Sequence, residues 1–264
     1  MARLPVYRTA VDVPVLRHKF PLTIKSLHQI ELTSLCSLRC VYCPSSQIVA
    51  ANAPSRPAMD MAVPVFVRAL EHVARYVKQG TQDVLNVAGI GESMMRDDFM
   101  TLMRLAREKL PLGPNRNPIP IILATNGLHM TDSIAAEMHR LFVGCWISLH
   151  RPEKAGLAIE IAKRHDVYVG ISTDPATNAD DWAGQVKWRR SQPYVSACMW
   201  LREGKAMVMA HGGVTTCCLD ASGVGTIGHV DDAIGSLAVR PYSLCQTCAQ
   251  EVAVDGYDQR MDIK

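Results

Sequence analysis

Three cysteines crowded into residues 36–43 constrain this chain more than any other feature. Cys36, Cys40 and Cys43 follow the pattern C-x₃-C-x₂-C, directly after the mixed apolar and polar stretch 29–35. Thiolates at this spacing can bind three corners of a cubane iron–sulfur cluster, because its irons favour soft sulfur ligands. The next cysteine along the chain is Cys145. One iron is therefore left without a protein ligand and is able to bind a substrate or cofactor directly.

The residues alone leave two alternatives open for this triplet. A structural zinc site needs four ligands, and no His or Cys lies between Cys43 and His72 to complete one. A disulfide joins cysteines in pairs and leaves the third thiol unexplained. A cluster with an open iron accounts for the spacing better than either alternative.

Composition and charge narrow the class of protein. Of the 264 residues, 48% are hydrophobic, which is enough for a buried core in one large or two small domains. The net charge of +3 is small and the basic residues are dispersed, so we expect no nucleic-acid partner. Charged residues interrupt the N-terminal stretch, so we expect no signal peptide and no membrane span. Nine cysteines with two C-x₂-C pairs indicate metal ligation in a reducing compartment, and hence a cytoplasmic location.

Apolar periodicity predicts strands that alternate with helices. After an extended lead-in, strands are expected at 29–35, from Val84 into a glycine-rich turn, and at 118–124, 143–149 and 167–172. Helices are expected at 60–79, 97–110, 132–141 and 153–165, and a surface loop at 45–59. This alternation is characteristic of parallel βαβ units and predicts an α/β fold. Functional residues of such folds lie at the carboxyl ends of the strands.

The turn after the second predicted strand reads Gly89-Ile-Gly91-Glu92-Ser93. Glycines allow the backbone to approach a ligand closely, and a neighbouring carboxylate can accept hydrogen bonds from an ammonium group. An ordinary strand-to-helix loop explains the same residues, so the turn is weak as a signal by itself.

The C-terminal part is rich in cysteine and glycine and has no long helical pattern. A connector with a short helix is predicted at 174–190, and five cysteines follow within the next stretch: Cys198, Cys217, Cys218, Cys245 and Cys248. Such a concentration predicts a second metal site, with the C-x₂-C pair as its most specific element. A small module that consists of loops has little hydrophobic core and usually needs a bound metal of this kind to be stable. A zinc ribbon remains an alternative on spacing.

With Tyr42 placed just before its third cysteine, the triplet resembles the signature of the radical S-adenosylmethionine (radical SAM) superfamily. The resemblance implies a partial (β/α)₆ TIM-like barrel with the cluster loop after the first strand. It implies a [4Fe–4S] cluster on Cys36, Cys40 and Cys43, with SAM bound at the open iron. An external reductant such as flavodoxin or ferredoxin would then be a partner.

The glycine-rich turn is similar to the family's "GGE" motif, which binds the amino group of SAM. By this match Gly91 and Glu92, supported by Gly89, would contact the cofactor, and Tyr42 would lie beside it. Ser93 stands where the family usually has proline, which implies a less rigid turn with the same binding groups.

Two more strand ends resemble SAM-binding positions of the family. Asn126 lies in a Thr-Asn-Gly sequence similar to one that reaches SAM, although Asn-Gly is also common in ordinary turns. Ser148 stands where the family has a Ser or Thr that contacts SAM. His150 or Arg151 would contact substrate, but a single His at a strand end is more often only hydrogen-bonded. No residue is selected as the catalytic base.

Residues 212–220 and 227–230 resemble the hairpin of the "twitch" half of a SPASM domain. The implied ligands of an auxiliary [4Fe–4S] cluster are Cys198, Cys217, Cys245 and Cys248. Four thiolates close that cluster, which suits electron transfer better than substrate binding. Cys218 would then be a neighbour in the hairpin, and Cys145 a small residue of the buried core.

The resemblance implies a lead-in (1–27), a partial barrel (28–190) and a twitch-like auxiliary module (191–264). It implies an oxidoreductase that cleaves SAM reductively to a 5′-deoxyadenosyl radical, which abstracts hydrogen from a substrate C–H bond while the auxiliary cluster accepts an electron. Oxidation of a small alcohol or sugar-like metabolite fits best, because no spare block of ~80 residues remains for a leader-peptide-binding domain. Modification of a ribosomally made peptide is the alternative. A two-cluster electron carrier without catalysis would leave residues 89–92 unexplained.

Overall fold

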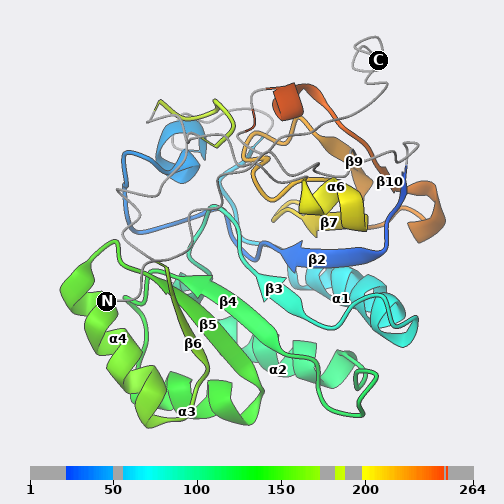
Figure 1. Cartoon of the computed structure of the whole chain (residues 1–264). Coiled ribbons are helices and arrows are strands. Elements are labelled where there is room, and N and C mark those ends of the chain that lie inside the picture. The colour runs from blue at the N-terminus through cyan, green and yellow to red at the C-terminus, as the bar shows by residue number, and fades with distance from the viewer. Residues whose placement is uncertain (1–21, 50–55, 173–181, 188–197, 247, 249–264) are drawn as a thin grey trace, which may run out of the picture.

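One eight-stranded sheet organises the chain (Figure 1). The computed structural model describes residues 22–49, 56–172, 182–187, 198–246 and 248. The strand order is β6-β5-β4-β3-β2-β7-β8-β9. These strands are β2 (Ser26–Ile30), β3 (Leu85–Val87), β4 (Ile121–Thr125), β5 (Val143–Ser148), β6 (Val169–Ser172), β7 (Lys205–Val208), β8 (Gly213–Thr215) and β9 (Thr226–His229). Strands β2 to β7 run parallel and β8 and β9 antiparallel. The predicted α/β class with a parallel sheet is therefore confirmed.

Four helices connect the parallel strands and lie along the outside of the curved sheet in Figure 1. They are α1 (Val63–Lys78), α2 (Phe99–Lys109), α3 (Asp132–Arg140) and α4 (Pro152–Arg164). A shorter helix, α6 (Met199–Glu203), precedes β7, and a pair of two-residue strands, β1 (Leu22–Thr23) and β10 (Ala238–Val239), lies apart from the sheet. Among the described residues, no helix has both the length and the apolar character that crossing a membrane requires.

Each predicted strand and helix of the region 60–172 is present, with ends that shift by a few residues. Helix α1 shows why: Phe66, Leu70, Val73 and Val77 recur at helical spacing and are all buried against the sheet. Gly80 follows with a φ of 71° and donates its N–H to the Val77 carbonyl, which ends the helix.

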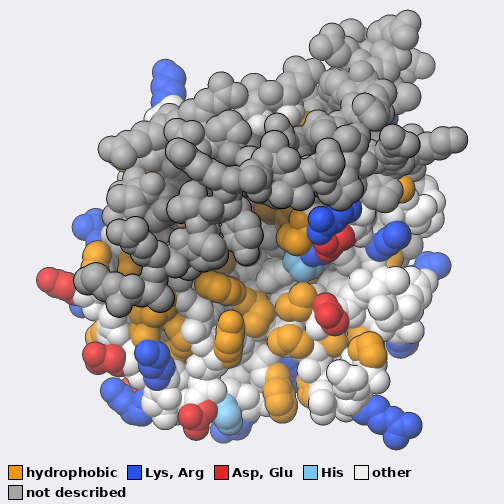
Figure 2. Space-filling model, viewed as in Figure 1, with side chains coloured by type: hydrophobic (Ala, Val, Ile, Leu, Met, Phe, Trp, Pro, Cys, Tyr) orange, Lys and Arg blue, Asp and Glu red, His pale blue; other side chains and the backbone are white. Residues whose placement is uncertain are grey.

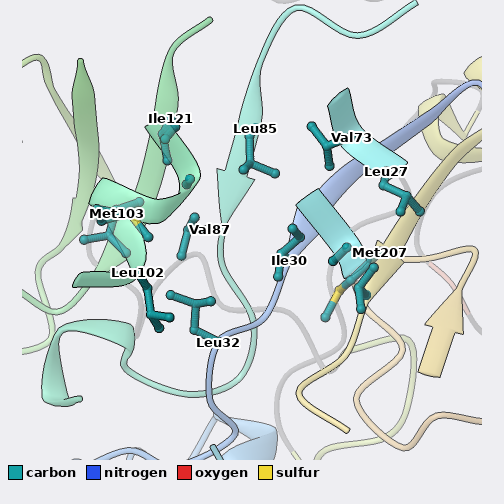
Figure 3. Close-up of a cluster of buried hydrophobic side chains, with 14 of the residues drawn as sticks. Leu27, Ile30, Leu32, Val73, Leu85, Val87, Leu102, Met103, Ile121 and Met207 are labelled. Atoms are coloured by element: carbon teal, nitrogen blue, oxygen red, sulfur yellow. The ribbon is translucent and has the colours of Figure 1, made fainter. Parts of the chain in front are cut away.

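The main hydrophobic core joins the first strands to the first two helices (Figure 3). Ile30 and Leu85 from neighbouring strands meet Leu102 and Met103 from α2, and all are fully or almost fully buried. Cys145 on β5 is also fully buried, as predicted for a core residue.

The first barrel strand was predicted at 29–35, but β2 ends at Ile30. The following residues instead hold the segment before α1. The Ser34 hydroxyl donates to the Pro57 carbonyl at 2.9 Å and accepts the Met59 N–H at 2.9 Å. The prediction of a surface loop at 45–59 is wrong at its described end, because Arg56 is only 1% exposed. Residues 45–49 form a short π-helix.

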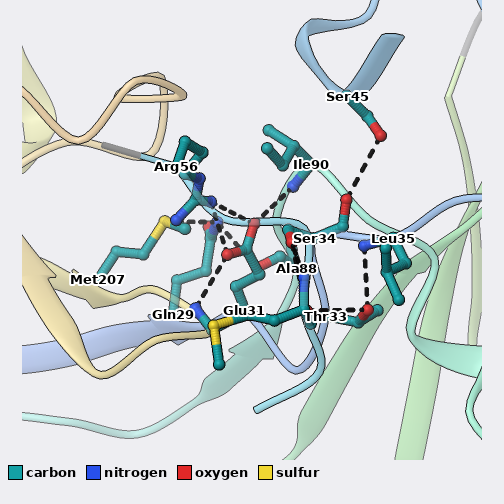
Figure 4. Close-up of polar contacts among 12 residues, drawn as sticks. Gln29, Glu31, Thr33, Ser34, Leu35, Ser45, Arg56, Ala88, Ile90 and Met207 are labelled. Atoms are coloured by element: carbon teal, nitrogen blue, oxygen red, sulfur yellow. Dashed lines mark hydrogen bonds and ion pairs between the residues drawn. The ribbon is translucent and has the colours of Figure 1, made fainter. Parts of the chain in front are cut away.

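A buried ion pair explains why Arg56 lies inside (Figure 4). Its Nη2 lies 2.5 and 2.6 Å from the two carboxylate oxygens of Glu31. The same carboxylate accepts the backbone N–H groups of Ile90 and Ala210, each at 3.0 Å. A Cβ at Gly89 would lie 2.3 Å from the Glu31 side chain, so this position has to be glycine. Glu31 therefore ties together β2, the segment before α1, the turn after β3 and the turn after β7.

Exposed apolar side chains lie at the open edge of the sheet. Trp146 on β5 and Ile171 on β6 are both about half exposed. In Figure 2, hydrophobic side chains gather over the part of this face where β4, β5 and β6 lie in Figure 1, with charged side chains around the periphery.

The predicted domain boundaries stay predictions. The lead-in up to residue 21 and most of the connector 174–190 lie outside the described residues. Strand β7, which belongs to the predicted auxiliary module, pairs in parallel with β2 of the predicted barrel. The two predicted parts thus share one sheet.

We expect the Glu31→Ala variant to lose about 3–5 kcal/mol of unfolding free energy, because it leaves the Arg56 cation buried without its partner. Equilibrium urea unfolding under anaerobic conditions measures the loss. The control is Arg68→Ala, which removes an exposed ion pair with Glu71 and should leave the unfolding midpoint nearly unchanged. Similar unfolding midpoints for the two variants would show that the buried pair adds little.

Candidate active site

A cavity of about 340 Å³ lies at the carboxyl ends of the parallel strands. Most of its lining comes from the ends of β4 and β5 and from the segments that follow β2, β3, β4 and β5. All of the cofactor and cluster residues predicted for the barrel line it: Cys36, Cys40, Tyr42, Cys43, Gly89, Gly91, Glu92, Asn126 and Ser148. The structure therefore brings together residues that are far apart in the sequence, although their binding roles remain predictions.

The three thiols of the loop after β2 face this cavity. Burial raises the pKa of the Cys36 thiol and raises that of Cys43 to about 11. Metals bind the thiolate, so the positive charge of a bound metal has to offset this burial. Nowhere in the described part of the chain do three His, Cys, Asp or Glu side chains gather as a single metal ion would require.

Glu92 is 2% exposed and already accepts three hydrogen bonds. Its Oε1 accepts from the Met94 N–H at 3.1 Å and the Thr125 hydroxyl at 2.9 Å, and its Oε2 accepts from the Asn126 N–H at 2.7 Å. Burial raises the pKa of this carboxyl, and the three donors oppose the rise. An ionised carboxylate has about four acceptor sites, so one site on Oε2 remains for a ligand ammonium group.

The glycines of this turn are required by packing inside the protein. A Cβ at Gly91 would lie 2.2 Å from the Thr33 carbonyl oxygen. The Glu92 N–H donates to the Leu35 carbonyl at 2.7 Å. The turn after β3 thus rests directly on the backbone that leads into the cysteine loop, which fixes Glu92 beside Cys36.

Asn126 combines the two roles that the sequence left open. Its Oδ1 accepts the Leu128 N–H at 2.9 Å, as in an ordinary turn. Its Nδ2 points toward the Cys36 sulfur at 4.0 Å. Thr125, which the sequence analysis did not select, lies between Glu92 and Gly127 and hydrogen-bonds to both.

Tyr42 and His150 form a stacked pair at the cavity wall. Their ring centroids are 5.7 Å apart with an interplanar angle of 17°. The Tyr42 hydroxyl lies 2.8 Å from His150 Nδ1, and the Cys40 sulfur lies 3.8 Å from the same nitrogen. Burial lowers the pKa of His150, so a neutral ring that accepts from Tyr42 fits this contact. His150 therefore lies beside the cysteine loop, whereas Arg151 is not among the residues that line the cavity.

The C-terminal part supplies one wall of the same cavity through Trp182 and Leu219. The side-chain amide of Gln185 donates to the backbone carbonyls of both residues at 2.6 Å. Its Oε1 accepts from the N–H and the hydroxyl of Ser222. Sequence analysis missed these residues, because isolated side chains in loops show no periodic signal.

A second pocket, of about 20 Å³, lies in the C-terminal part. It is lined by five cysteines: Cys198, Cys217, Cys218, Cys245 and Cys248. Four of these are the predicted auxiliary ligands, and Cys218 stands beside them. Burial raises the pKa of Cys198 and that of Cys245, the latter to about 12. For Cys217 the hydrogen bond with Cys218 is the largest cause of a raised pKa, followed by burial.

Comparison with known proteins agrees with this geometry. Residues 30–150 match the family model of the radical SAM superfamily. No curated protein matches the sequence significantly. The structure is similar to BtrN in complex with AdoMet and 2-DOIA, with a TM-score of 0.58, 16% identity, and coverage of 79% of this chain and 80% of that one.

A second similar structure is native anSMEcpe with bound AdoMet, with a TM-score of 0.56, 16% identity, and coverage of 86% and 87%. The complex of anSMEcpe with AdoMet and the Cp18Cys peptide gives a TM-score of 0.52, 14% identity, and coverage of 86% of both chains. At these identities the likeness shows the fold. The chain thus matches the radical SAM family model over residues 30–150, and its fold resembles the partial barrels of BtrN and anSMEcpe.

Proposed function

We propose that this protein cleaves SAM reductively and uses the resulting radical to oxidise a small alcohol or sugar-like metabolite. One observation carries the proposal: Leu219 lines both the large cavity and the pocket of five cysteines. A substrate in the cavity would lie one side chain away from a second metal site. Such proximity favours electron transfer between them.

The residues of the large cavity fit a [4Fe–4S] cluster and SAM. Cys36, Cys40 and Cys43 would hold the cluster, and the vacant acceptor site of Glu92 would take the SAM ammonium group. A reduced cluster held there would supply the electron that splits SAM into methionine and a 5′-deoxyadenosyl radical. The apolar side chains of Ile90 and Leu219 limit the access of water to this wall.

Oxidation of an alcohol to a ketone removes one hydrogen atom, one electron and one proton from the substrate. The hydrogen atom ends on 5′-deoxyadenosine and the proton goes to a base or to water. An auxiliary cluster, which Cys198, Cys217, Cys245 and Cys248 would hold, would accept the electron. An external electron carrier such as flavodoxin or ferredoxin would supply the electron for SAM cleavage.

The size of the cavity favours a compact substrate. Small-molecule sites span roughly 300–1,000 Å³, and this cavity of about 340 Å³ lies near the lower limit. SAM itself would fill much of that space, which leaves little room for a peptide. Structures of both kinds are similar in fold: BtrN with 2-DOIA and anSMEcpe with a peptide. A peptide substrate is therefore the competing outcome of the tests.

The sequence adds support for the architecture. It resembles 2-deoxy-scyllo-inosamine dehydrogenase in length, in its single auxiliary module and in the Cys-Met pair at 198–199. The stretch between Gly228 and Cys245 is shorter here than in that enzyme. The resemblance therefore supports the arrangement of the sites more than the identity of the substrate.

Changing Cys36, Cys40 and Cys43 together to Ala should abolish 5′-deoxyadenosine formation and leave about half of the iron, because one of two clusters is lost. Chromatography after anaerobic incubation with SAM and dithionite, together with iron analysis, checks this. The buried Cys145 provides the control, since Cys145→Ala should keep both iron and cleavage. Normal SAM cleavage by the triple variant would refute the cluster assignment.

Glu92→Ala should weaken SAM binding by about 1.5–3 kcal/mol, because a charge-assisted hydrogen bond in a buried site is lost. Equilibrium dialysis with the reconstituted protein measures the affinity. The control is Thr125→Val, which removes one donor to Glu92 but keeps its charge and should cost less. Equal losses would mean that Glu92 acts only by holding the turn together.

Changing Cys245 and Cys248 together to Ser should lower the iron content and stop net product formation, while some SAM cleavage survives. Cys218→Ala should do neither, because Cys218 is not one of the four proposed ligands. Mössbauer spectroscopy with iron and zinc analysis identifies the metal, and candidate alcohols and peptides are then compared for product formation. One cluster plus one zinc per chain would contradict the electron-acceptor role.

A further inference from the structure

The hydroxyl of Tyr242 is a buried polar group that has no hydrogen-bond partner among the described residues. Tyr242 is 7% exposed and lines the second pocket beside the five cysteines. A buried tyrosine hydroxyl usually finds a partner, because burial of an unpaired polar group is costly. The unpaired hydroxyl in this pocket is therefore available to a thiolate sulfur, such as forms when cysteines bind a metal cluster.

Close packing fixes the position of the Tyr242 ring. A Cβ at Gly225 would lie 2.4 Å from the ring carbon that carries the hydroxyl. The Gly225 N–H donates to Asp220 Oδ2 at 2.8 Å, and the Thr215 hydroxyl donates to the same oxygen at 2.6 Å. On the other side, the Cys245 N–H donates to the Tyr242 carbonyl at 2.9 Å. The ring is held between the turn after β8 and one of the proposed ligands.

Cys217 is the proposed ligand that already receives a hydrogen bond. The Leu219 N–H donates to its sulfur at 3.3 Å. Cys217 packs against the buried cluster that Tyr242 forms with Ala183 and Leu244. A tyrosine hydroxyl ordinarily has a pKa of ~10, so at neutral pH it keeps its proton and is able to donate it in a hydrogen bond.

We propose that Tyr242 donates a hydrogen bond to the Cys217 sulfur of the auxiliary cluster and thereby raises the reduction potential of that cluster. The inference rests on the proposed function, since it requires a cluster on these cysteines. Reduction adds negative charge to a cluster, and donors to its sulfurs stabilise that charge. Tyr242 and the Leu219 N–H would act on the same sulfur, next to the wall that the substrate cavity shares. Tyr242 is thus a tuning residue that does not touch the substrate.

The test is the Tyr242→Phe variant of the full-length, reconstituted protein, which keeps the ring and removes the hydroxyl. Redox titration followed by EPR measures the midpoint potential of the auxiliary cluster. We expect reduction of this cluster to become about tenfold less favourable, a fall of ~59 mV for one electron, with unchanged iron content. The matched control is Tyr168→Phe, which removes the hydroxyl of a 62% exposed tyrosine and should leave the potential unchanged.

An unchanged potential in a Tyr242→Phe protein with full iron would overturn the inference and leave the proposed function intact. A wild-type protein with zinc or no metal at the C-terminal cysteines would overturn both. If Tyr242→Phe does not assemble the cluster, 3-fluorotyrosine at position 242 provides the second variant. It keeps the hydroxyl and strengthens it as a donor, so the potential should rise, and a constant or lower potential would refute the inference.

Discussion

The arrangement of the large cavity depends on the contacts that the carboxylate of Glu31 makes. It is buried with Arg56 and also accepts backbone N–H groups from the turns after β3 and β7. A buried charge is tolerated only when it is paired and hydrogen-bonded, so these segments cannot separate without exposing it. The loop that carries Cys36, Cys40 and Cys43 begins after Glu31. The chain comes back to the Glu31 carboxylate at Arg56. The loop is therefore anchored on both sides of its thiols, and the turn that carries Glu92 is anchored with it.

The glycine-rich turn shows how packing and binding share one motif. The sequence suggested that its glycines bring the backbone close to a ligand. The structure shows that they bring it close to Glu31 and to the Thr33 carbonyl, and this contact directs the carboxylate of Glu92 toward the cavity. A substitution at Gly89 or Gly91 would therefore disturb the cavity by changing the packing of the turn beneath it. The packing role of these glycines is thus seen in the structure, while the binding role of the turn stays a prediction.

Local patterns account for what the sequence could predict. The periodicity of residues 60–172 identified each strand and helix. Asn126 and Ser148 were selected because they resemble positions of the radical SAM family, and the structure places both on the cavity wall. Contacts between residues that are far apart in the sequence could not be predicted. The pairing of Glu31 with Arg56 and that of β7 with β2 depend on tertiary packing. Neither leaves a periodic trace in the sequence.

The pairing of β7 with β2 also bears on electron transfer. A metal module attached only by a linker would vary in its distance from the barrel, and electron transfer would vary with it. Here backbone hydrogen bonds continue the barrel sheet into β7, β8 and β9. Leu219, which lines both pockets, follows shortly after β8. The side-chain amide of Gln185 links it to Trp182 by hydrogen bonds to both backbone carbonyls. The sheet therefore fixes the separation of the two groups of cysteines, so an electron acceptor at the second group would need no domain movement to receive its electron.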